Sequence, residues 1–121
     1  MCPARLLLYS FKRNYMQIIK LKNFGNVLIS RPAGLEAFNA IRPGLDPATP
    51  TEIDFDGVLT VTPSWLDEFL TQLTDFNAGK VELLPTKNAS VLATLPVLAE
   101  AREDLVAATI QRALKKWGNE I

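Results

Sequence analysis

A buried strand that leads directly into an amphipathic helix constrains the fold of this chain more than any other feature. Residues 52–61 predict the strand, and its apolar members are Ile53, Phe55 and Val58. One continuous apolar stripe predicts the helix, and it is formed at helical spacing by Leu66, Phe69, Leu70, Leu73 and Phe76. Strands that alternate with helices in this way are typical of α/β domains.

Two shorter strands are predicted ahead of this unit, over residues 17–22 and 27–30. The turn between them includes Gly25 and Asn26, which both adopt positive φ readily. We therefore expect the two strands to pair as a hairpin. A helix over residues 34–41 follows the second strand.

The C-terminal third predicts a strand over residues 81–84, one or two helical turns over 88–95, and a long final helix. Pro96 suits the first position of that helix, and Gly118 suits its end. The element order β-β-α-β-α-β-α predicts a single α/β domain with a mostly parallel, mixed sheet of four to five strands. In this arrangement the hairpin lies at one edge, and three to four helices pack on the sheet.

The length of 121 residues indicates one domain. The regular pattern of elements begins at Met16, so residues 16–121 are expected to form the domain. Residues 1–15 differ from the rest of the chain and have two interpretations. Either Met16 is the true start of translation and residues 1–15 are an upstream extension, or they add an edge strand.

The composition argues against several classes of function. The chain has no histidine, which removes the usual general base near neutral pH and every histidine-containing metal site. Its single cysteine, Cys2, forms no internal disulfide, which fits a reducing compartment. The formal net charge is zero and the N-terminal basic residues are scattered without aromatic neighbours, so we expect no nucleic-acid partner. No apolar run approaches the ~20 residues of a membrane span, and we expect a cytoplasmic protein without a cofactor.

Asp54 and Asp56 allow one catalytic hypothesis. The sequence from Asp54 to Thr60 resembles the first motif of the haloacid-dehalogenase-like phosphatases. That resemblance implies Asp54 as nucleophile, Asp56 as general acid and base, and Mg²⁺ held between them. The alternative, which we favour, is that both carboxylates are solvated at the strand end or accept hydrogen bonds from turn amides, and bind no metal.

A longer resemblance covers Met16 to about Glu100. The segment Phe24–Arg31, the segment Ile53–Val58, and the run Ser64-Trp-Leu-Asp-Glu68 are together similar to the STAS family, the domain of sulphate transporters and anti-sigma-factor antagonists. In particular, the chain resembles bacterial STAS-like domains of unknown function. The resemblance implies a non-catalytic module of a bacterial signalling system.

In the antagonists a partner kinase phosphorylates a serine at the turn into the helix, and that position falls on Ser64. Thr62 stands where those proteins have an aspartate, Pro63 where they have another serine, and Trp65 where they have a glycine. These departures place recognition by a kinase in question. The resemblance nevertheless suggests partners such as a histidine-kinase-like ATPase or another signalling protein.

The turn residues also have plain structural interpretations. Ser64 can cap the helix with Asp67 three residues later, or Thr62 can cap it with Pro63 in the first helical position. Trp65 lies off the main stripe and is either an exposed contact residue or packed under the neighbouring loop. We expect the interaction surface at Thr62, Ser64, Trp65, Asp67 and Glu68, with Asp54 and Asp56 on a supporting acidic strand.

Overall fold

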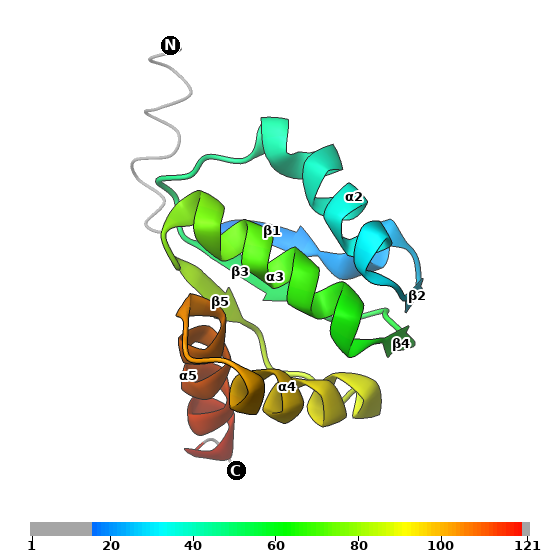
Figure 1. Ribbon diagram of the computed structural model, residues 1–121, viewed down its shortest axis with the longest axis vertical. Helices are drawn as coiled ribbons and strands as arrows, with labels where there is room; N and C mark the ends of the chain where they lie inside the picture. Colours follow the sequence, from blue (N-terminus) through cyan, green and yellow to red (C-terminus); the bar gives the residue numbers. More distant parts are fainter. Residues whose placement is uncertain (1–15, 120–121) are drawn as a thin grey trace.

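Two strand–helix–strand crossovers form the centre of the molecule (Figure 1). The structure is a computed structural model that describes residues 16–119, so the expectations for residues 1–15 lie outside it. Three strands form one parallel sheet in the order β1 (Gln17–Lys20), β3 (Thr51–Asp54), β5 (Val81–Leu83). A second, two-stranded parallel sheet pairs β2 (Val27–Leu28) with β4 (Thr60–Val61).

Four α-helices connect or follow these strands. They are α2 (Arg31–Ile41), α3 (Pro63–Asn77), α4 (Ala89–Ala101) and α5 (Leu105–Asn119). Two short 3₁₀ turns, η1 (Leu21–Phe24) and η2 (Arg42–Gly44), complete the order of elements. The fold is therefore α/β, as the alternation of strands and helices predicted, and every strand pair within residues 16–119 is parallel, where a mixed sheet was expected.

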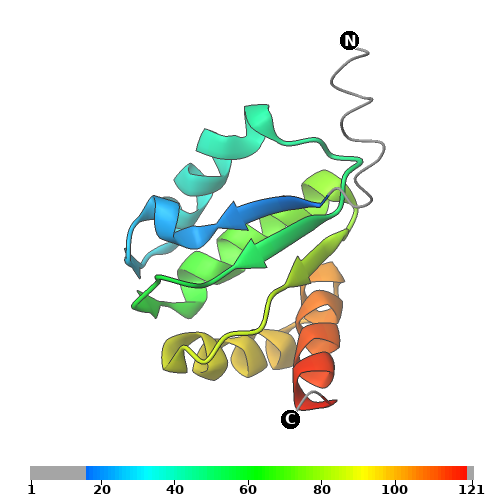
Figure 2. The same cartoon turned by 180° about the vertical axis from the view of Figure 1, so that it is seen from behind.

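The helices α2 and α3 lie side by side over one face of the three-stranded sheet, and Figure 2 shows β1 and β3 from the opposite side. Ile19 and Ile53 point toward these helices and are buried, together with the apolar stripe of α3. The alternating residues Lys20, Glu52 and Asp54 point to the other face, since neighbouring strand residues face opposite sides. Most of the core thus lies between one face of the sheet and the helix layer.

The predicted hairpin is wrong. β1 and β2 do not pair with each other; β1 pairs with β3, and β2 pairs with β4. The residues after β1 form the 3₁₀ turn η1, in which Leu21 is fully buried. The chain therefore does not fold back to pair β2 with β1. The predicted single sheet of four to five strands is therefore divided into a three-stranded and a two-stranded sheet.

The predicted long final helix is also wrong. Asn88 caps a helix that already begins at Ala89, and its side chain accepts hydrogen bonds from the amides of Ser90 and Val91 at 2.9 and 3.1 Å. Pro96 lies inside this helix, α4, and not at the start of the next one. Arg102 is extended (φ −148°, ψ 166°) and separates α4 from α5.

Candidate functional site

The predicted interaction residues lie at the N-terminus of α3, directly after β4. Thr62 is the N-cap, with its side chain accepting from the amide of Trp65 at 3.5 Å, and Pro63 occupies the first helical position. Of the two predicted caps, Thr62 is therefore the one found. Ser64 is half-buried in the first turn, and its Oγ lies 3.4 Å from Thr62 Oγ1.

Trp65 belongs to the core. Only 1% of the residue is exposed, and its ring stacks on Phe69 with centroids 5.0 Å apart and planes 13° apart. Phe24 packs against it at 6.0 Å. Of the two interpretations of Trp65, burial is correct, so this side chain makes no exposed contact of its own.

The backbone of Trp65 also determines how closely α2 approaches α3. A Cβ built on Gly34 would lie 2.5 Å from the Trp65 carbonyl oxygen, which is closer than real Cβ atoms come. Glycine at position 34 therefore permits a helix contact that any side chain would obstruct. This contact joins the candidate surface on α3 to the first turns of α2.

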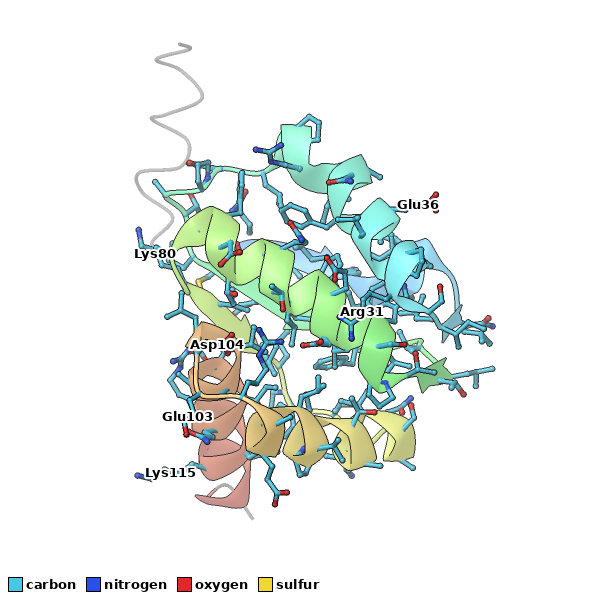
Figure 3. The ribbon with its side chains drawn as sticks, viewed as in Figure 1. Arg31, Glu36, Lys80, Glu103, Asp104 and Lys115 are labelled. Atoms are coloured by element: carbon cyan, nitrogen blue, oxygen red, sulfur yellow. The ribbon has the colours of Figure 1, made fainter. Side chains whose placement is uncertain are left out.

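Asp67 and Glu68 take part in an ion-pair network with three further residues. Arg31 Nη1 donates to Asp67 at 2.8 Å and to Glu68 at 3.4 Å, and Figure 3 shows Arg31 lying against α3. Arg102 donates to Asp67 and to Asp104. We call these five residues the Asp67 network. It ties the starts of α2 and α3 to the α4–α5 connection.

The network shifts the pKa values of three of its members. The hydrogen bond to Asp67 raises the pKa of Arg31, and the hydrogen bond to Asp104 raises the pKa of Arg102. The hydrogen bond from Arg102 lowers the pKa of Asp104. Each of these three shifts favours the charged form of its own group.

A shallow groove of about 440 Å³, with a lining that is polar and apolar in about equal parts, lies beside this turn, between β2 and α2. Trp65 and Ala33 line it, and Glu36 lies at its side. Val27 and Ile29 also line it, although about half of each side chain is exposed (53% and 51%). A groove that combines exposed apolar side chains with polar surface has the composition of an ordinary protein interface.

Asp54 and Asp56 are not brought together with the α3 surface. Asp54 is the last residue of β3 and faces the side of the sheet opposite the helices. Its Oδ1 accepts the backbone amide of Asp56 at 2.9 Å, as the turn interpretation predicted. In the register of the sheet, Lys20 lies beside Asp54, while the stem of Lys22 packs over Gly57.

Among residues 16–119, no group of three or more acidic, histidine or cysteine side chains is placed to hold a metal ion. In the same part of the chain, no helix is long and apolar enough to span a bilayer. Comparisons with protein-family models, with curated proteins and with solved structures gave no match for this chain.

Three participants of the site were not predicted from the sequence. The first is Arg31, which binds Asp67 and Glu68. Arg102 and Asp104 were assigned to the interior of a long helix. Asp104 lies directly before α5 and accepts a hydrogen bond from the Ala107 amide, and an aspartate in such a position is a common helix-start signal.

Proposed function

We propose that this chain is a non-catalytic, STAS-like interaction module of a bacterial signalling system. Its binding surface consists of the turn Thr62–Glu68 and the adjoining groove between β2 and α2. The partner is another signalling protein, for which a histidine-kinase-like ATPase is the first candidate. The observation that carries the proposal is the pair of exposed apolar residues, Val27 and Ile29, in the groove beside the charged turn.

The exposure and the fixed geometry of this surface support binding rather than catalysis. Pro63 is exposed and Ser64 half-exposed at the turn, while the carboxylates of Asp67 and Glu68 are already engaged by arginines. Groups held in one geometry lose little conformational freedom when a partner binds. A partner segment seated in the groove would bury Val27 and Ile29 and contact the turn at its end.

Ser64 is the point at which this surface would be regulated. It lies three residues before Asp67 and four before Glu68, so all three side chains share one face of α3. A phosphate on Ser64 would be favoured by the helix N-terminus but repelled by these two carboxylates. It would compete for Arg31 and so change the charge that a partner meets.

The first test measures binding at this surface. A partner is captured from cell extract, purified, and titrated against the wild type and the variants Ser64→Asp and Ile29→Lys. Both variants should weaken binding at least tenfold, and the control Gln111→Lys on the exposed face of α5 should not. A partner that binds all four proteins equally would refute this assignment of the surface.

Phosphorylation of Ser64 is tested separately. The captured partner and ATP are incubated with the wild type and with Ser64→Ala, and phosphopeptides are mapped by mass spectrometry. Phosphate on Ser64 of the wild type is the expected result. Phosphate placed only on other residues would remove Ser64 from the proposal while leaving the binding surface intact.

The small Mg²⁺-dependent phosphatase remains the alternative, because Asp54 ends the central strand and Lys20 lies beside it. Two features favour the binding module instead. The Asp54 carboxylate is occupied by the Asp56 amide, and the order β1-β3-β5 lacks the reversal of strand order at which open α/β sheets form their ligand crevice. Hydrolysis of p-nitrophenyl phosphate with Mg²⁺, lost in Asp54→Asn, would establish the phosphatase.

A further inference from the structure

The helix α4 is apolar on its exposed face as well as on its buried face. All of its residues except Ser90, Thr94 and Glu100 are apolar. Its inner face packs in the core through Val91, Leu95 and Leu98. The outer face exposes a stripe that runs the length of the helix, namely Ala89, Leu92, Ala93, Pro96, Val97 and Ala101.

The exposed faces of the neighbouring helices are different. The outer side of α3 presents Asp75 and that of α5 presents Gln111, Lys115 and Lys116. Leu92 is 42% exposed and Val97 is 56% exposed. A helix that is apolar all round is normally buried on all sides, so this stripe indicates a surface that another molecule covers.

We infer that the stripe is the interface of a homodimer, in which two copies of α4 pack antiparallel about a twofold axis. The stripe matches itself in that arrangement. With the axis near the midpoint of the helix, Leu92 lies opposite Val97 of the second copy, and Ala93 lies opposite its Pro96. The small residues Ala89, Ala93 and Ala101 allow the two backbones to approach closely.

The charges at the ends of the stripe favour the same arrangement. Glu100, the one charged residue on the exposed face of α4, lies beside the C-terminal end of the stripe, and Lys87 is exposed just before its N-terminal end. Thirteen helical residues span about 20 Å, so an antiparallel partner of equal length brings Glu100 to the opposite Lys87 and the first turn of α4. Both the lysine and the helix dipole attract that carboxylate. A twofold axis makes this contact twice.

This inference is independent of the proposed function, because α4 and the turn Thr62–Glu68 are separate surfaces. Sedimentation equilibrium of the full chain, from micromolar to submillimolar concentration, should show a reversible monomer–dimer equilibrium. Leu92→Glu should raise the dissociation constant at least about 100-fold, since each dimer loses two buried leucines. The matched control is Leu35→Glu, at a leucine of α2 that is 37% exposed, and it should leave the equilibrium unchanged.

A charge exchange tests the antiparallel register. Glu100→Lys and Lys87→Glu should each weaken the dimer roughly threefold to tenfold, and the double variant should restore it. A chain that stays monomeric throughout would overturn the inference, and so would vesicle binding by the monomer. A dimer insensitive to Leu92→Glu, or a double variant weaker than both single variants, would also overturn it.

Discussion

At the scale of single residues, the meeting of Gly34 and Trp65 determines the packing of the helix layer. The missing side chain at Gly34 lets α2 rest on the backbone of α3, where a Cβ would also come within 3.2 Å of the Trp65 carbonyl carbon. The indole of Trp65 then packs against both Phe24 and Phe69, which also contact each other. One backbone contact and one aromatic cluster therefore position the start of α3.

Gly34→Ala should destabilise the fold by about 1–3 kcal/mol, because the obstructing atoms are backbone and move only with the helix. Urea unfolding of the variant measures the loss. Gly44→Ala is the matched control, since a Cβ there has no neighbour within 4 Å, and it should leave stability unchanged or slightly higher. Equal stability of the two variants would show that α2 and α3 separate readily.

Trp65→Ala should reduce the free energy of unfolding by about 3–5 kcal/mol, because it leaves a cavity among buried aromatic rings. Chemical denaturation followed by circular dichroism measures this change. Leu59→Ala, at a residue that is 66% exposed, should change stability by less than about 0.5 kcal/mol. A stable, folded Trp65→Ala protein would contradict the burial of this side chain.

At the scale of elements, the starts of the helices are fixed by side-chain caps and joined by ions. Thr62 caps α3, Asn88 caps α4, and Asp104 accepts the amide of Ala107 at 3.4 Å in the first turn of α5. Asp104 also binds Arg102, so one carboxylate both caps α5 and joins the Asp67 network. The orientation of α5 relative to α3 depends in part on this carboxylate.

Asp104→Asn separates the two roles, because asparagine keeps the cap and loses the charge. The pKa of Asp104 is lowered in the folded state, so its ion pair stabilises the fold above the unfolded pKa. That stabilisation is lost as pH falls through the lowered value. At neutral pH the free energy of unfolding of the wild type should exceed that of the variant by about a few tenths of a kcal/mol. The value is small because half of the Asp104 side chain is exposed.

Urea unfolding from about pH 7 to about pH 2 follows this difference across the titration range of aspartate. The difference in the free energy of unfolding should shrink toward zero as the pH falls. A difference that grows as the pH falls would have a pH dependence opposite to the expected one. It would rule out the ion pair as the source of the difference.

At the scale of the whole molecule, the sheet is covered on one face and closed at one edge. Parallel sheets are usually covered on both faces, yet the side of β1 and β3 opposite α2 and α3 carries Lys20, Glu52 and Asp54 beside the exposed Ile18. Polar residues on this face keep it compatible with water. At the β5 edge, Arg112 of α5 donates to the Val81 carbonyl at 2.6 Å and to Glu82 at 3.2 Å.

Arg112→Ala should therefore expose the β5 edge. We expect a loss of about 1–2 kcal/mol from the unpaired carbonyl, together with faster aggregation, since open edges pair with other chains. Unfolding and light scattering measure the two effects. Lys115→Ala removes an exposed cation from the same helix and should produce neither. Aggregation of both variants at one rate would attribute the effect to charge alone.

Local patterns in the sequence determined the α/β class, the helix α2, and the helix α3 with its buried stripe. The single strand predicted over residues 52–61 is wrong, because the turn at Asp56 and Gly57 divides it into β3 and β4. Local patterns also determined Thr62 as one of two possible caps and the turn role of Asp54. These features arise within a few residues of one another, where side-chain spacing and capping chemistry decide the structure.

Only the tertiary structure decided the pairing of β1 with β3 and of β2 with β4, the burial of Trp65, and the joining of Arg31 and Arg102 at Asp67. The break at Arg102 also required it, because the residues from Pro96 onward fit one helix as well as two. Such features depend on which segments, distant in the sequence, come into contact. Local patterns allow many such contacts, and the packing of α2 against α3 through Gly34 favours one of them.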